Sequence, residues 1–198
     1  GPTLIVIGVQ PYWLYMLLWA VTGLGVAGIG FSIMHDANHD AYSNNPKFNR
    51  ALGVIMNAVG GYDLNWRIQH NILHHSYTNV DGHDEDILAQ PMLRFSPNQP
   101  LLKRHRFQFI YGWFFYSLMT LFLVTYKDFA QIIRYDRMNL LGSQKTNLKK
   151  ALVRLSVYKV IYYAVMLVLP MIFAPFAWWQ VLLGFVMMHG IIGLILSM

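Results

Sequence analysis

The chain has 198 residues, of which 56% are hydrophobic and only 12% charged, and it carries a formal net charge of +6. An average soluble domain is about 45–50% apolar and about 25% charged, so this composition excludes an ordinary soluble domain and indicates a membrane protein. Because cysteine is absent, disulfides and thiolate metal sites are excluded. The excess of basic residues is explained better by the cytoplasmic loops of a membrane protein than by nucleic-acid binding.

The chain opens with a short apolar stretch that is followed by a full membrane helix. Residues 1–10 are far shorter than the roughly 20 residues that a spanning helix needs, so we interpret them as the tail of a truncated membrane helix. Aromatic residues from Tyr12 to Trp19 are typical of a membrane–water interface. The pattern predicts a membrane helix over 12–34 and no secretory signal before it.

A glycine pattern inside this helix, GLGVAG at 23–28, formally matches a dinucleotide-binding fingerprint. That fingerprint needs a preceding strand and an acidic residue about 20 positions later, whereas these glycines interrupt a continuous membrane-length apolar run. We therefore reject nucleotide binding. Small residues such as Gly23 and Ala27 are expected to let another helix approach closely.

Two histidine clusters, HDANH and HNILHH, carry the candidate metal ligands. Side chains four residues apart on a helix lie on the same side, roughly 6 Å apart, which suits His35 with His39 and His70 with His74 for holding a metal together. His75 lies roughly 100° further around the helix, and this arrangement suits two neighbouring metals better than one. Imidazole binds zinc, copper, iron or nickel, so the ligand type alone does not choose the metal.

The segment between the clusters is predicted to lie along the membrane surface. Asn45 and Pro46 form a typical helix start, and the helix is expected to run to about Val59 and stop at Gly60. About 14 residues are too few to cross the hydrocarbon core. Both clusters are therefore placed on one side of the membrane, in a cytosolic region over residues 35–106.

The topology of the second half depends on residues 107–126, which are apolar and long enough to pass for a membrane span. Residues 127–155 contain seven Lys and Arg residues and two Asp residues, and a crossing would place this basic stretch outside, against the positive-inside bias. We therefore predict an interfacial or re-entrant helix over 107–126 and a basic cytosolic segment over 127–155. Membrane helices over 156–173 and 178–198 follow.

The other ionisable candidates have weaker patterns. His83 is expected to be solvated near acidic residues, His105 to belong to a basic interfacial collar, and His189 to serve helix packing or to form a polar point near a channel between the helices. Asp36 and the acidic residues 84–86 are candidates for orienting imidazoles by accepting their second N–H group, although a soluble loop explains them equally well.

Three segments together resemble the membrane-bound fatty acid desaturases: FSIMHDANHDAYS, NWRIQHNILHHSYTNVDGHDEDI and KRHRFQFIYGWFFY. Within that family the linoleoyl-CoA and front-end branch is the most similar. The resemblance implies an all-α integral membrane protein, a multi-pass helical bundle with a cytosolic histidine-rich helical cap. Residues 1–198 would be a partial desaturase domain that is truncated at both ends.

The resemblance also implies the chemistry. Family members hold two iron ions with histidines from three boxes, and the first two boxes fall on the five residues named above. They use O2 and two electrons to leave a cis double bond in a fatty acyl chain. The implied partners are an acyl-CoA or acyl-lipid substrate, membrane lipid and a separate electron donor of the ferredoxin or cytochrome b5 type. The histidines would face the cytoplasm, at a bacterial inner membrane.

Departures from the family pattern limit what this chain can do alone. The third box, H/QxxHH, and a further family histidine are expected beyond Met198. Two irons need roughly eight or more ligands, and five histidines cannot supply them, so we predict that this chain alone cannot assemble the complete site and is inactive. Asp40 stands where the family usually has glycine, and Phe109 stands where many relatives have histidine.

Alternative functions remain. A membrane hydroxylase of the same superfamily uses similar boxes, and nothing in this segment separates the two reactions. Alternatives from a different class are a metal transporter and a non-catalytic membrane protein. A transporter would place its ligands mid-span along a pathway, whereas five of the eight histidines form two surface clusters, which favours a fixed site. Three basic residues near the boxes are Lys47, Arg50 and Arg67. They could bind the phosphates of acyl-CoA or of anionic lipids, and the positive-inside bias accounts for their presence equally well.

Overall fold

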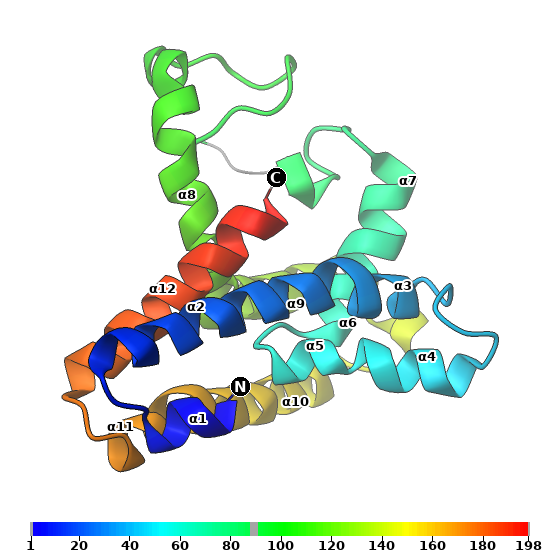
Figure 1. Cartoon of the computed structure of the whole chain (residues 1–198). Coiled ribbons are helices and arrows are strands. Elements are labelled where there is room, and N and C mark those ends of the chain that lie inside the picture. The colour runs from blue at the N-terminus through cyan, green and yellow to red at the C-terminus, as the bar shows by residue number, and fades with distance from the viewer. Residues whose placement is uncertain (1, 88–90, 198) are drawn as a thin grey trace.

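The computed structural model describes residues 2–87 and 91–197, and within these ranges every regular element is a helix (Figure 1). Four continuous helices are long and apolar enough to cross a membrane. They are Tyr12–Asn38, Lys103–Arg137, Leu148–Phe173 and Trp178–Leu196. The prediction of an all-α integral membrane protein is confirmed.

The first long helix carries the first histidine cluster beyond the apolar part of the chain. It runs without a break through α2 (Tyr12–Ile29), the π-helical turn η1 (Gly30–Met34) and α3 (His35–Asn38). Its 27 residues extend about 40 Å, whereas the hydrocarbon core is about 30 Å thick. The helix predicted over 12–34 therefore continues further, and His35 lies on it rather than after it.

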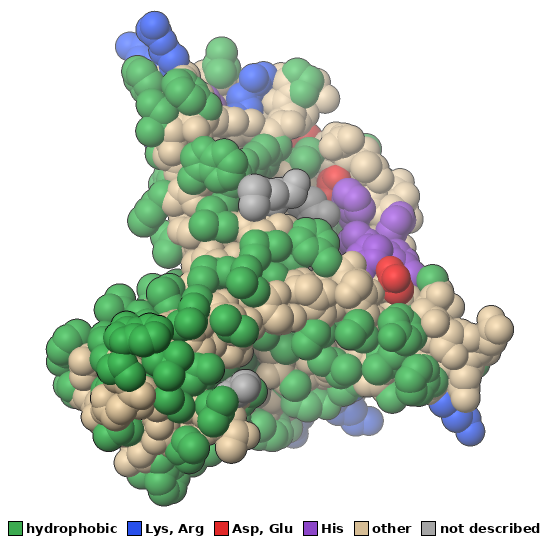
Figure 2. Space-filling model, in the orientation of Figure 1, with side chains coloured by type: hydrophobic (Ala, Val, Ile, Leu, Met, Phe, Trp, Pro, Cys, Tyr) green, Lys and Arg blue, Asp and Glu red, His purple; other side chains and the backbone are tan. Residues whose placement is uncertain are grey.

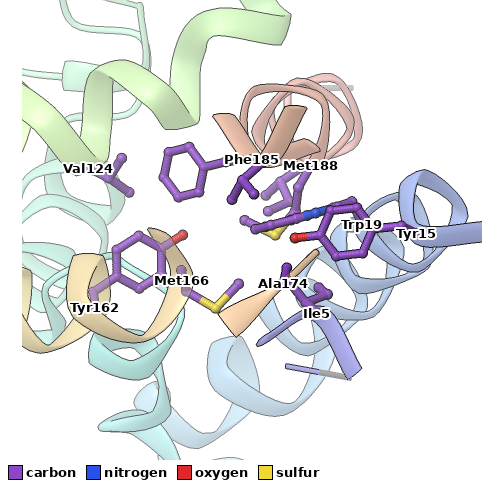
Figure 3. Packing of buried hydrophobic residues seen from close by; sticks show 11 residues of the cluster. Ile5, Tyr15, Trp19, Val124, Tyr162, Met166, Ala174, Phe185 and Met188 are labelled. Carbon is purple, nitrogen blue, oxygen red and sulfur yellow. The ribbon is translucent and has the colours of Figure 1, made fainter. Parts of the chain in front are cut away.

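The membrane part has a buried core between α1 (Pro2–Ile7), α2, α10 (Leu148–Tyr163) and α12 (Trp178–Leu196). The last of these helices begins at Trp178, the first residue of the span predicted over 178–198. Figure 3 shows how side chains from these helices point toward one another. They include Ile5, Tyr15, Trp19, Tyr162, Met166, Phe185 and Met188. Aromatic side chains supply much of this buried surface.

Small residues set how closely α2 and α12 approach each other. A Cβ atom on Gly23 would lie 3.0 Å from the backbone oxygen of Met188, and Ala27 is fully buried. In the opposite direction, Gly184 leaves room for the indole of Trp19, which a Cβ atom there would overlap. The prediction that Gly23 and Ala27 allow close helix packing is confirmed.

The third long helix begins earlier than predicted. It consists of α10, the π-helical turn η7 (Ala164–Val168) and α11 (Leu169–Phe173), whereas the apolar pattern gave 156–173. The Asn147 side chain caps its start by accepting the backbone N–H of Lys150 at 3.0 Å. Hydropathy marks where a helix becomes apolar rather than where it begins, so the charged first turns fall within the basic cytosolic segment predicted over 127–155.

The segment predicted as interfacial is part of a longer helix. The turn η4 (Lys103–Phe107) leads into α8 (Gln108–Phe122), which continues through η5 (Leu123–Lys127) into α9 (Asp128–Arg137). The predicted boundary at the end of 107–126 therefore falls inside a helix. In Figure 1, α8 stands at a steep angle to α2, whereas α9 runs behind α2. The axis of this long helix therefore changes direction near the π-helical η5. The interfacial or re-entrant position stays a prediction.

The single helix predicted between the histidine clusters is divided into two short helices at Val54. Asn45 accepts the backbone N–H groups of the first turn of α4 (Pro46–Gly53), which is followed by α5 (Ile55–Ala58). The chain then turns at Gly60, whose φ of +96° is accessible to glycine and strained for other residues. Both the predicted start and the predicted stop of this helical segment are confirmed.

The second histidine cluster lies on a continuous helical segment made of α6 (Asp63–Trp66), the π-helical η2 (Arg67–His74) and α7 (His75–Tyr77). A second buried core lies beneath it, against α9 and α10. This core consists of Tyr62, Leu64, Ile68, Leu73, Ile132, Tyr135, Leu141, Ala151 and Leu155. Two further 3₁₀ turns are η3 (Glu85–Ile87) and η6 (Gly142–Gln144).

A buried ion pair joins these elements. The ammonium nitrogen of Lys159 on α10 lies 2.5 Å from a carboxylate oxygen of Asp128 on α9, and it donates to the backbone oxygen of Gly60 at 2.6 Å. Asn65 on α6 donates to the backbone oxygen of Asp128 at 2.7 Å and to its carboxylate at 3.1 Å. The helix that presents the second cluster is thereby fixed to α9 and α10.

Candidate metal centre

The five box histidines gather on one face of the molecule, visible as the purple group in Figure 2. The ring centres of His35 and His39 are 4.6 Å apart, and the ring of His39 lies 5.0 Å from that of His70. His75 is 4.8 Å from His70, and His74 stacks against His70 at 5.4 Å. Residues from two clusters that are far apart in the sequence therefore form one continuous set of imidazoles.

Three of these histidines form the tightest group. One ring nitrogen from each of His35, His39 and His70 lies within 4.8 Å of the other two. Metal–nitrogen bonds to histidine are about 2.0–2.1 Å, so small side-chain rotations would bring these atoms to a shared ion. His74 and His75 adjoin the group from the same helix. Two first-box residues and one second-box residue thus meet at its centre.

The π-helical geometry of η2 explains why His75 joins the group. A π-helix closes its hydrogen bonds from residue i to i+5, so it turns less per residue than an α-helix. The residue five places after His70 therefore returns toward the same face. The ring centre of His75 lies 5.6 Å from that of His74 and 5.1 Å from that of His39. Single π-turns are frequent at functional sites.

Two asparagines lock the clusters to each other. Asn71 of η2 donates from its side chain to the backbone oxygen of Asn38 at 2.9 Å. Asn38 in turn donates to the backbone oxygens of Met34 at 3.1 Å and Gly53 at 3.5 Å. Sequence reasoning missed both asparagines. Their only signal is that each lies directly beside a box histidine.

Trp66 forms an apolar wall behind the group. Its ring stacks on His70 with a centre-to-centre distance of 4.5 Å, and it meets His35 and His39 edge-on at 5.9 and 5.7 Å. Sequence reasoning did not single out this tryptophan. A residue one helical turn before the first ligand of a box is the signal that could have found it.

Each box has an acidic partner. Nδ1 of His74 lies 3.1 and 3.2 Å from the two carboxylate oxygens of the fully buried Asp84, which also accepts the backbone N–H of Asn79 at 2.8 Å. A carboxylate that accepts from one ring nitrogen is the usual means of orienting a metal-binding imidazole. In the first box, Asp36 lies 3.1 Å from Nδ1 of His35, but its side chain is 53% exposed. The predicted orienting contacts thus exist for both residues.

Glu85 differs from its neighbour Asp84 because it faces α9. It accepts from Gln131 at 2.5 Å and from the Tyr135 hydroxyl at 3.0 Å. Gln131 also donates to Gln69, the residue before His70, at 2.8 Å. One α9 side chain therefore braces both η2 and the loop that carries Asp84. The side chain of Asp86 lies outside the described part of the chain.

The electrostatics favour neutral imidazole, the form that binds metals. Burial, followed by repulsion from the surrounding histidines, lowers the pKa of His70 to about 4. Burial and the neighbouring His35 and His75 also lower the pKa of His39. Nε2 of His70 is buried and has no hydrogen-bond partner among the described residues. A metal ion would satisfy this nitrogen, so the donor set fits a bound metal.

The remaining histidines lie apart from this group. His83 is exposed beside Tyr77, as expected for a solvated residue. The ring of His105, which was predicted to lie in a basic interfacial collar, is buried and hydrogen-bonded to the backbone of Leu102 and Pro91. His189 is buried between helices, where it pairs with the Tyr162 hydroxyl at 2.8 Å, a contact that fits the favoured role in helix packing.

Fold and site together define a multi-helix membrane protein with a histidine-lined candidate metal centre at one end of its helices. Residues 11–198 match the family model described as fatty acid desaturase, and the chain belongs to that family. No solved structure matches it.

Curated relatives agree with this assignment. The chain is 38% identical over 117 residues to the sn-1 linoleoyl-lipid 6-desaturase of Arthrospira platensis, covering 59% of this chain and 32% of the relative. It is 42% identical over 106 residues to the enzyme of the same name from Synechocystis, covering 54% and 30%. A chloroplastic acyl-lipid (7-3)-desaturase of Chlamydomonas reinhardtii is 42% identical over 53% of this chain and 20% of its own length. The matches span about a third or less of each relative.

Proposed function

We propose that this protein is a membrane acyl-lipid desaturase that introduces a cis double bond into a fatty acyl chain with a histidine-held di-iron centre and O2. The observation that carries the proposal is the convergence of both histidine boxes on His70, whose buried ring nitrogen has no partner among the described residues. The names of the matched relatives favour a lipid-linked acyl chain over acyl-CoA.

The residues of this chain hold and shield the reacting centre. Bound iron would supply the oxygen chemistry, in which an acyl chain loses two hydrogens while O2, two electrons and two protons become two water molecules. His35, His39 and His70 supply the central nitrogen ligands. Asp84 fixes the ring of His74, and Trp66 keeps water from one side of the group.

Five imidazoles are fewer than the roughly eight or more ligands that two near-octahedral ions need. The proposal therefore includes ligands in addition to these five histidines. It also includes a separate electron donor of the ferredoxin or cytochrome b5 type, which the family resemblance supports. A chain limited to these 198 residues is expected to bind metal incompletely and to be inactive.

The test is metal binding by the purified chain. Titration with Co²⁺, followed by its visible absorption, is expected to show binding that falls at least tenfold in His70→Ala. The exposed His83→Ala is the matched control and should leave the affinity unchanged. Equal losses in both variants would contradict a centre at the boxes. Two tightly bound irons per chain, together with turnover, would contradict the ligand count.

We further propose that the histidines and the start of α10 share the cytoplasmic side of a bacterial inner membrane. Supporting this, the Tyr62 hydroxyl donates to the backbone oxygen of Ala151 at 3.2 Å, which brings α10 against the second cluster. Because the chain has no cysteine, single cysteines report on sidedness directly. Asn44→Cys and Ser143→Cys should react with an impermeant maleimide from the cytoplasmic side, and Ala177→Cys from the other. Opposite labelling of positions 44 and 143 would show that 107–126 crosses.

A further inference from the structure

A cluster of three arginines surrounds one buried carboxylate below α5 and α6. Asp63 is fully buried and accepts from Arg67 at 2.8 Å, and nitrogen atoms of Arg50 and Arg154 each lie 3.6 Å from its oxygens. The arginines come from α4, η2 and α10, which are separate parts of the chain. Positive-inside bias accounts for basic residues on this side but not for their convergence on one point.

The single carboxylate does not neutralise this cluster. Burial raises the pKa of Asp63, but Arg67 and the other donors outweigh it and hold that pKa below its usual value, so Asp63 stays charged. Arg67 is its close partner and is only 13% exposed. Burial lowers the pKa of Arg67, and the charges of Arg50 and Arg154 lower it further. Two guanidinium groups therefore remain without a full counter-charge.

These two guanidinium groups are open to the surroundings. The side chain of Arg50 is 51% exposed and that of Arg154 is 42% exposed. A guanidinium offers planar, paired donors that match a phosphate or carboxylate group. Arg154 also donates to the Tyr158 hydroxyl at 3.5 Å, and among the described residues Asp63 is the one carboxylate that pairs with Arg50 and Arg154, so both present donors for a further anion.

An open groove of about 780 Å³ adjoins the cluster and shares Arg154 with it. Its lining includes Lys149 and Lys150 from the first turn of α10, and Asp136 is its one acidic residue. The start of a helix also carries partial positive charge. An anion held at Arg154 would therefore experience attraction from both sides.

The exposed face of α10 becomes apolar next to this groove. Val153, Val157, Val160 and Ile161 are 58%, 52%, 68% and 54% exposed and lie on a helix long enough to cross a membrane. A free phosphate makes no favourable contact with such an apolar surface, whereas the acyl chains of a lipid would cover it. The position of the cations at the edge of this surface matches that of a lipid phosphate.

We propose that Arg50 and Arg154 bind the headgroup phosphate of an anionic membrane phospholipid whose acyl chains lie along α10. This site is separate from the histidine group and does not require that the bound lipid carries the reacting chain. Its test needs neither iron nor turnover, so its failure would leave the proposed desaturase function untouched.

The experiment measures phosphatidylglycerol binding to the purified chain in neutral detergent by intact-complex mass spectrometry. The wild-type chain is expected to bind one molecule saturably, and the double variant Arg50→Gln/Arg154→Gln should bind at least tenfold more weakly. Lys47→Gln/Arg137→Gln removes the same charge from exposed positions outside the cluster and should change the affinity less than twofold. Arg50→Lys/Arg154→Lys keeps the charge without the paired donors and should recover only part of the binding.

Three outcomes would overturn the proposal. Equal weakening in both glutamine variants would show diffuse attraction to positive charge. Equally tight binding of phosphatidylcholine would remove the requirement for an anionic headgroup. Effective competition by glycerol phosphate would show a soluble phosphate ligand instead of a lipid. Unfolding temperatures of all variants distinguish a lost site from a lost fold, and the lysine variant supplies the comparison if the glutamine variant does not fold.

Discussion

The two histidine boxes look alike in the sequence but are supported very differently in the structure. The first lies at the end of a membrane helix, and its acidic partner Asp36 is about half exposed. The second lies on a π-helix above its own hydrophobic core, and its acidic partner Asp84 is fully buried. The comparison teaches that similar ligand spacing does not imply similar rigidity.

Support for the second box comes from distant parts of the chain. Gln131 and Tyr135 of α9 hold Glu85, next to Asp84, and Gln131 also holds Gln69, next to His70. The first box is held to the second mainly through the Asn71–Asn38 hydrogen bond. We infer that the second box is the rigid half of the centre and that the first box adjusts to it.

The largest expected difference is between the two acidic partners. Asp84→Asn should lower metal affinity about 10- to 100-fold, because a buried carboxylate orients His74 and raises its basicity. Asp36→Asn should lower it less than about threefold, since an exposed pair contributes little. Co²⁺ titration of both variants measures this ratio. Equal effects would show that the boxes are equally supported.

Removing the α9 brace should have a smaller effect. Gln131→Leu removes one donor from the half-buried Gln69 and one from the buried Glu85, which should lower the free energy of unfolding by about 2 kcal/mol. Gln108→Leu removes a comparable pair of bonds to the backbone of Arg94, away from the histidines. Both variants should lose stability in denaturant titrations, and only Gln131→Leu should weaken metal binding. Equal metal affinity in the two variants would contradict the role of Gln131 in supporting the metal centre.

Metal-free protein should become less stable as the pH falls from about 6.5 to about 4. The unfolded chain protonates His70 near its ordinary pKa of about 6.5, whereas the folded chain holds it neutral down to about 4. The unfolded state therefore binds more protons in this range. Thermal unfolding at pH 7 and pH 5 should show a smaller drop for His70→Gln than for the wild-type chain. An identical drop would show that His70 is not held neutral.

The smallest expected effect concerns Asp40, directly after the first box. Its φ of 57° lies in the left-handed region, which explains why glycine is usual there in the family that the sequence resembles. Asp40→Gly should leave stability unchanged or raise it by less than about 1 kcal/mol. Asp36→Gly, inside helical α3, should instead lower stability by about 1 kcal/mol. Thermal unfolding of the pair tests the assignment, and a loss in Asp40→Gly would contradict it.

Local signals in the sequence were sufficient for much of the fold. Asn45 before Pro46 predicted a capped helix because both residues act within one turn, and the histidine spacing predicted rings on a shared face. The start of α10 was missed because Lys149, Lys150 and Arg154 resemble a loop when only apolarity is scored. The structure shows that Asn147 caps a helix there.

The contacts that support the site were beyond sequence reasoning for a physical reason. Asp84 reaches His74 only because the loop between them turns at Asn79, which has a φ of 62°. Gln131 lies 62 residues from Gln69, and no periodic pattern relates the two. The turn angle of η2 also depends on its π-helical hydrogen bonds, which no spacing of histidines reveals.

The buried pair of Lys159 and Asp128 has a consequence for the biogenesis of the protein. A lysine at the centre of a membrane helix costs about 2.5–3.5 kcal/mol to insert alone, and one nearer the end of the apolar run, such as Lys159, costs less. The aspartate precedes the lysine by 31 residues, so the ribosome has already released it when α10 reaches the translocon. Asp128 is therefore available to pair with the lysine as soon as α10 is made. We infer that the order of synthesis favours this ion pair, because the counter-ion precedes the helix that needs it.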